Sequence, residues 1–71
     1  MKVLLTMIMC SNLHSMCLDP HPLSHHNNMY DCLMAGYEEA SVKQKEVGKE
    51  DTNKHEVFIK FTCTWERVNN A

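Results

Sequence analysis

The chain has 71 residues and a net charge of −2, with acidic and basic side chains interspersed along it. A chain this short forms one domain at most, and a single core supplies only ~3–5 kcal/mol, so disulfides, a metal or a partner must add stability. No basic stripe is present for neutralising phosphates, which argues against nucleic-acid binding. No apolar run reaches the ~20 residues of a membrane-spanning helix.

Residues 1–10 are predicted to form a buried strand. Apolar residues occupy both alternating sets from Val3 to Cys10, which is typical of a strand covered on both faces or of a central strand in an assembled sheet. A short secretory signal is the alternative, because Lys2 precedes the apolar run. The strand is favoured because no small-x-small cleavage site follows and Met9 is too bulky for a lipoprotein signal.

Residues 11–28 are predicted to form a long loop. Pro20 and Pro22 interrupt any helix, because proline lacks a backbone N–H and restricts the residue before it. A loop of this length is uncommon in compact domains, which indicates a segment that is functional, mobile or covalently anchored. It carries four of the five histidines, namely His14, His21, His25 and His26.

Residues 29–53 are predicted to form one long helix. Asn27 or Asn28 supplies the N-cap, and Asp31 suits the positive end of the helix dipole. Gly36 costs ~1 kcal/mol relative to alanine inside a helix, which indicates close approach to a sheet. Gly48 is an alternative end of the helix. The predicted core face contains Met29, Leu33, Gly36, Ala40 and Val47, with Cys32 at its edge.

Residues 56–66 alternate between two faces, which predicts a half-buried strand, and residues 67–71 are predicted to be a frayed tail. Phe58 and Lys60 lie on one face, and Val57, Ile59, Phe61, Cys63 and Trp65 lie on the other.

The order strand, loop, helix, strand predicts a small α+β domain with two layers, in which two strands pack on one long helix. If the two strands pair in parallel, the crossover is right-handed, and all four cysteines converge at one end of the molecule. These cysteines are Cys10, Cys17, Cys32 and Cys63.

An even number of cysteines in so short a chain favours a disulfide framework, and hence an oxidising compartment or a virion. Four cysteines allow three pairing patterns. We favour Cys17–Cys32, which anchors the loop to the helix, together with Cys10–Cys63 across the strand ends.

Two other uses of the cysteines stay open. A zinc site would take Cys10, Cys17, His14 and His21 as ligands, although a Cys-x-x-Cys pair is absent. A thiol nucleophile would be Cys32 with His25 or His26, but Asp31 beside Cys32 opposes a lowered thiol pKa.

Surface aromatic residues and loop histidines are the candidates for binding a protein partner. The histidines could also form a pH switch, although a solvated polar loop is the simpler interpretation. The unpaired edges of a two-stranded sheet offer a route to homo-oligomers. The partner-binding candidates are His21, His25, His26, Tyr30, Tyr37, Phe58 and Trp65.

Five short stretches of the chain carry a resemblance to other sequences. They are Met9-Cys10-Ser11, Cys17 with Asp19-Pro20, Tyr30-Asp31-Cys32-Leu33, Ala35-Gly36-Tyr37-Glu38, and Ile59-Lys60-Phe61 with Cys63. In these stretches the chain resembles a group of small cysteine-containing proteins encoded by marine tailed bacteriophages. The resemblance covers most of the chain and implies a viral origin, with the four cysteines acting as a set; it implies no catalytic residue and no cofactor.

These observations predict a non-catalytic phage accessory protein that binds a host factor or another phage component. One alternative is a minor structural or decoration protein of the virion. Another is a small thiol- or zinc-dependent enzyme.

Overall fold

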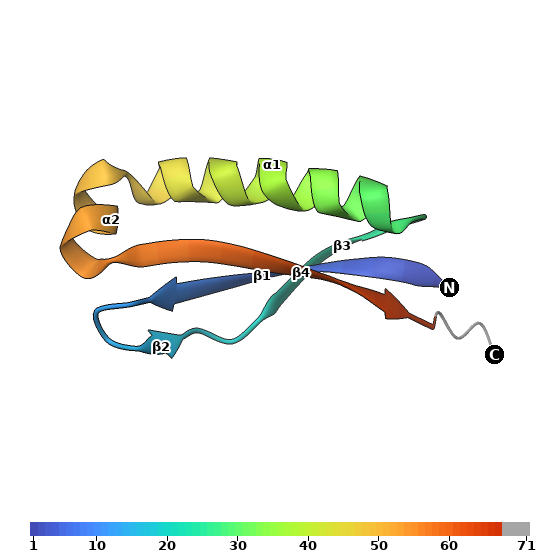
Figure 1. The fold of residues 1–71 in the computed structure, drawn as a ribbon, viewed down its shortest axis with the longest axis horizontal. Coiled ribbons are helices and arrows are strands. Elements are labelled where there is room, and N and C mark those ends of the chain that lie inside the picture. The colour runs from blue at the N-terminus through green and yellow to red at the C-terminus, as the bar shows by residue number, and fades with distance from the viewer. Residues whose placement is uncertain (68–71) are drawn as a thin grey trace.

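The computed structural model describes residues 1–67 and shows an α+β fold with two layers (Figure 1). One layer is a four-stranded antiparallel sheet of β1 (Lys2–Ser11), β2 (Met16–Cys17), β3 (His21–His26) and β4 (Val57–Glu66). The long helix α1 (Met29–Val47) covers one face of the sheet, and the short helix α2 (Lys49–His55) leads into β4. The predicted small, disulfide-stabilised α+β domain is thus confirmed.

β1 is the central strand of the sheet. β4 pairs with β1 along its whole length, from Lys2 opposite Glu66 to Ser11 opposite Val57. β2 and β3 must therefore share the other side of β1, where β2 pairs with its end and β3 with its beginning. β2 and β3 act as two parts of one interrupted edge strand, and the sheet is effectively three strands wide.

The segment 11–28, predicted as a loop, contributes β2 and β3. These strands reverse the directions of α1 and β4 relative to the predicted arrangement. β3 returns the chain to the beginning of β1 before α1 starts, so α1 runs in the same direction as β1 and β4 must return antiparallel. The predicted convergence of the cysteines at one end is therefore wrong: Cys10 lies opposite Phe58, whereas Cys63 lies opposite Leu5.

Pro22 is compatible with β3 because of the hydrogen-bonding pattern of β1. The carbonyl of Met9 accepts from the N–H of Leu18 at 2.8 Å, so odd-numbered residues of β1 direct their backbone groups towards β2 and β3. Even-numbered residues, Thr6 among them, direct theirs towards β4. Pro22 lies opposite Thr6, where no N–H is needed, as expected for a proline in an edge strand.

The core is small and lies between β1 and α1. Val3, Leu5 and Cys32 are fully buried, and Phe61 and Cys63 pack against them. The other face of β1 has no layer over it among residues 1–67. Leu4 and Ile8 are half-buried there, and Cys10, which is joined to Cys17, is buried. Of the two predictions for the first strand, the central position in a sheet is confirmed and coverage of both faces is not.

The predicted helix over residues 29–53 is two helices separated at Gly48. Asn28 caps α1 by accepting from the N–H of Asp31 at 2.8 Å, as predicted. Gly48 ends α1 with φ 87°, and its N–H donates to the carbonyl of Gln44. Leu33, predicted for the core, is exposed because the helix turns its small residues Cys32 and Gly36 to the sheet. Neither helix in residues 1–67 is long and apolar enough to cross a membrane.

Gly36 allows α1 to approach the sheet closely, as predicted. A Cβ atom at this position would overlap the ring of Phe61. The same ring meets Tyr37 edge-on, with 5.0 Å between the centroids. The absence of a side chain at Gly36 therefore sets the distance between α1 and β4.

We predict that Gly36→Ala lowers the free energy of unfolding by up to about 2 kcal/mol in urea denaturation. Overlap with Phe61 costs ~1–3 kcal/mol, while helix propensity returns ~1 kcal/mol. Ser41→Ala, at an exposed position of the same helix, is the matched control and should leave stability unchanged or slightly raised. A stabilising Gly36→Ala would contradict close packing, because that is what propensity alone predicts.

Two disulfides form, and their pairing differs from the predicted one. Cys10–Cys17 joins β1 to β2, with 4.0 Å between the Cα atoms, and Cys32–Cys63 joins the first turn of α1 to β4, with 6.1 Å. Cys10 and Cys17 are direct cross-strand partners of a hairpin that the sequence did not reveal. The predicted framework is confirmed, but the predicted pairs Cys17–Cys32 and Cys10–Cys63 are wrong.

The two disulfides should contribute unequally to stability. They close loops with sequence separations of 31 residues for Cys32–Cys63 and 7 for Cys10–Cys17. Loop entropy then assigns ~3.7 kcal/mol to the first and ~2.4 kcal/mol to the second. Urea denaturation of the two paired cysteine-to-alanine variants checks this order, and an equal or larger loss for Cys10→Ala/Cys17→Ala would contradict it.

Candidate functional site

The candidate site is an apolar groove beside the edge formed by β2 and β3. Two adjoining hollows, of about 220 Å³ and about 230 Å³, share Met9 and Leu18 in their linings. Leu18 and Met16 are each about 60% exposed, and Met9 and Leu23 are more than one-third exposed. We call this surface the apolar groove; its apolar lining includes Met7, Met9, Met16, Leu18, Leu23, Val57 and Ile59.

The groove exists because α1 packs mainly over β4 and β1 and leaves β2 and the beginning of β3 uncovered. Tyr37 and Gly36 contact Phe61 of β4, and the side chain of Gln44 reaches the backbone of β4. The helix-facing side of the sheet is therefore left open next to β2 and β3. Leu18 and Leu23 extend from this edge beside the opening.

Gln44 fixes this position of the helix, because its side-chain amide makes the backbone hydrogen bonds that a neighbouring strand would make with β4. Its Nε2 donates to the carbonyl of Val57 at 3.1 Å, and its Oε1 accepts from the N–H of Ile59 at 3.0 Å. Nε2 also donates to the hydroxyl of Thr52 at 2.9 Å, which ties α2 to the same point. The side chain of Gln44 thus satisfies the outward-facing backbone groups at the beginning of β4.

The dimensions and lining of the groove favour a side chain over a free small molecule. Small-molecule pockets usually hold ~300–1,000 Å³ and enclose most of their ligand. Each hollow here is smaller and open. Methionine side chains adapt to ligands of irregular shape, which suits a surface that accepts an apolar anchor from a protein. The groove can thus receive one or two apolar side chains.

The predicted histidine candidates are separated in space. His21 lies in the lining of the groove, at the beginning of β3. His25 bonds through Nε2 to Oε1 of Glu66 at 2.7 Å, and His26 lies 2.8 Å from the hydroxyl of Ser24. Each of these three histidines therefore has different neighbours, and the pH switch stays a prediction.

A second pair of histidines, His14 and His55, borders the groove at its far end. Their rings stack with 6.5 Å between centroids, and both line the second hollow. His55 was not among the predicted site residues, because its place beside His14 depends on α2 folding back onto the β1–β2 turn.

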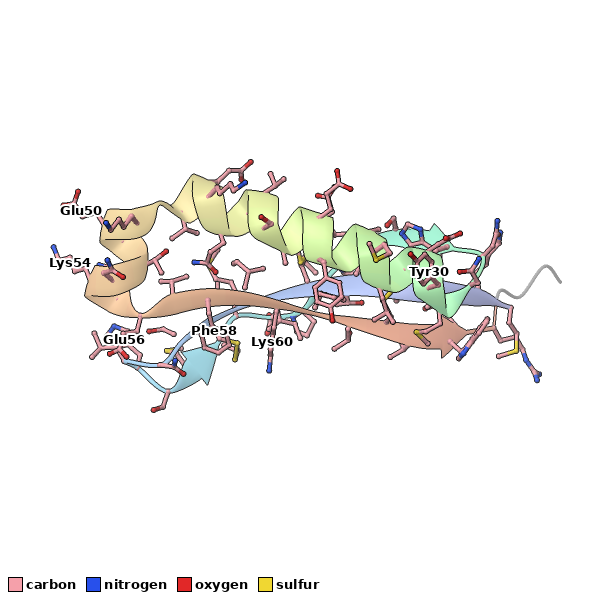
Figure 2. The ribbon with its side chains drawn as sticks, turned by 45° about the horizontal axis from the view of Figure 1, so that its top comes forward. Tyr30, Glu50, Lys54, Glu56, Phe58 and Lys60 are labelled. Atoms are coloured by element: carbon pink, nitrogen blue, oxygen red, sulfur yellow. A yellow bond between two sulfur atoms is a disulfide. The ribbon has the colours of Figure 1, made fainter. Side chains whose placement is uncertain are left out.

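The aromatic candidates divide between two surfaces. Tyr30, Tyr37 and Trp65 are more than half exposed on the helix side of the molecule. Phe58 lies with Lys60 on the face of the sheet that points away from α1 (Figure 2). None of the four lines the apolar groove. The sequence therefore identified surface residues but did not identify this surface.

The residues that prediction missed are Met16, Leu18 and Leu23. All three are apolar and lie in the segment read as a histidine-rich loop. The signal in the sequence was weak, because Met16, Cys17 and Leu18 form an apolar run of three residues, shorter than the runs that predict a strand.

The zinc and thiol alternatives both need cysteine sulfurs that the structure joins in disulfides. Cys10 and Cys17, two of the four proposed zinc ligands, are bonded to each other, and Cys32 is bonded to Cys63. Either alternative would require reduction of these bonds first.

No family model, no curated protein and no solved structure matches this chain. The fold and the surface define its class as a small, disulfide-bonded α+β domain with an open apolar groove.

Proposed function

We propose that the protein acts without catalysis, by binding another protein through the apolar groove. The observation that carries this proposal is the contiguous exposed apolar surface of Met9, Met16, Leu18 and Leu23 in a chain with a very small core. Exposed apolar patches with polar rims are characteristic of protein-interaction sites. Leaving these side chains exposed costs stability, which a binding role explains.

The rim of the groove indicates what the partner offers. Lys43 and Asp19 line the first hollow with His21, and His14 and His55 line the second. A partner segment with one or two apolar anchors and polar flanks satisfies both parts of the surface. The resemblance to phage-encoded proteins supports a host factor or another phage component as that partner. The two disulfides favour an oxidising compartment or a virion as the place of action.

We predict that Leu18→Asp abolishes partner binding without unfolding the protein. Leu18 is about 60% exposed, so a carboxylate there stays solvated in the free protein but is buried unpaired in the complex. Val42→Asp is the matched control, because Val42 is an exposed apolar residue of α1 outside the groove lining.

The measurement is quantitative affinity capture from phage-infected host lysate, followed by titration with the purified captured protein. A true partner is retained by the unmodified chain and by Val42→Asp, and its affinity for Leu18→Asp falls by about tenfold or more. Equal retention by both variants would refute binding through the groove.

A second candidate function, as a minor structural or decoration protein of the virion, is favoured by the open face of the sheet. Leu4, Ile8 and Phe58 are half-buried there with no layer above them among residues 1–67. Packing into a larger assembly would cover these side chains. Mass spectrometry of purified particles distinguishes the two functions, since an accessory protein is expected only in infected cells.

A further inference from the structure

The outer edge of β4 is half protected and half open. Even-numbered residues of β4 bond to β1, as shown by the N–H of Asn12 donating to the carbonyl of Glu56 at 3.0 Å. Odd-numbered residues therefore direct their N–H and C=O groups outwards. Gln44 covers this edge at Val57 and Ile59. From Phe61 to Trp65 no residue of the described chain covers it, and no proline or bulge interrupts it.

An uncharged stripe of α1 lies beside the open half of this edge. Gln44 and Tyr37 both reach towards β4, so the side of the helix that carries them faces the free edge. Tyr30, Leu33, Met34 and Tyr37 follow one another at helical spacing on this side, and all are exposed. Figure 2 shows Tyr30 at the end of the helix where β4 finishes. The outward-facing backbone groups of β4 and the exposed side chains of this stripe therefore lie next to each other.

We propose that this surface pairs with the same surface of a second copy, through antiparallel contact of the two β4 strands about a two-fold axis at Cys63. The covered residues Val57 and Ile59 limit the pairing to the open half, and the centre of that half is Cys63. About six backbone hydrogen bonds form, two for each of roughly three facing pairs. The two α1 stripes then face each other across the axis.

The sequence of β4 is complementary to itself in this register. Phe61 lies opposite Trp65 of the second copy, an aromatic pair of the kind that stabilises neighbouring strands. Thr62 lies opposite Thr64. Lys60 lies opposite Glu66 of the second copy, so each dimer contains two pairs of opposite charge on the face away from the helices. Figure 2 shows Lys60 directed to that face.

Neighbouring registers lose this complementarity. An axis at Thr62 places Lys60 opposite Thr64 and brings Trp65 against Ile59, whose N–H is already bonded to Gln44. An axis at Thr64 places Thr62 opposite Glu66 and shortens the paired segment. Of these three registers, only the axis at Cys63 pairs Lys60 with Glu66 and keeps Trp65 away from the edge covered by Gln44.

The test is a charge exchange, read by sedimentation velocity over a range of concentrations on the oxidised protein. In the Lys60→Glu dimer, both pairs of positions 60 and 66 consist of two carboxylates. In the Glu66→Lys dimer, both pairs consist of two ammonium groups. Each variant alone should weaken the dimer by about tenfold or more. An equimolar mixture of the two variants restores both opposite-charge pairs, so a heterodimer should form with close to the original affinity.

Two controls separate the register from other effects. Lys54→Glu makes the same change of charge on α2 and should leave the dimer intact. His25→Ala removes the contact of Glu66 with His25 within one chain and should also leave it intact. An unmodified chain that stays monomeric up to ~1 mM, or a mixture that fails to recover, would overturn the proposal. So would single variants that dimerise like the unmodified chain.

Discussion

The attachment of α1 to β4 is the constraint on which the rest of the structure depends. Three contacts lie along one line of the helix: Cys32 is bonded to Cys63, Gly36 meets Phe61, and Gln44 bonds to the backbone of Val57 and Ile59. Because they hold the helix over an outer strand, one side of α1 stands over the free edge of β4. The other side leaves the sheet open beside β2 and β3. The apolar groove and the open edge of β4 are both consequences of this displacement.

The same attachment explains how so small a core suffices. Among the described residues the buried hydrophobic side chains are Val3, Leu5, Met7, Cys10 and Cys32, and two of these belong to disulfides. Burial of a few such side chains contributes ~1.5–3 kcal/mol each, which does not offset the ordering of a whole chain. The disulfides lower the entropy of the unfolded chain instead. The apolar residues of the segment 11–28 are therefore not needed in the core and can line the apolar groove.

What the sequence could reveal follows from the range of each signal. The strand at 56–66, the cap at Asn28 and the close approach at Gly36 depend on a few neighbouring residues, and all three were predicted. The hairpin through Cys17 and the strand at His21–His26 were not predicted, because Pro20 and Pro22 gave the stronger local signal and only the register of β1 makes Pro22 acceptable. Without that strand, β4 was predicted parallel to β1 instead of antiparallel. This error led to the wrong disulfide pairs and to the wrong prediction that all four cysteines lie at one end. The groove was missed for the same reason, since it lies along the missing strands.

The apolar groove and the edge of β4 lie on opposite sides of α1, and this separation has a functional consequence. Pairing of two copies through β4 leaves both grooves open, at the outer margins of the extended sheet. A hollow of about 220 Å³ accepts few side chains, so a single groove binds its partner modestly. Two grooves held in one rigid dimer raise the affinity for a partner that presents repeated copies of its binding segment, because the second contact is then intramolecular. The proposed dimer is therefore best suited to a partner that is itself an oligomer or an ordered array.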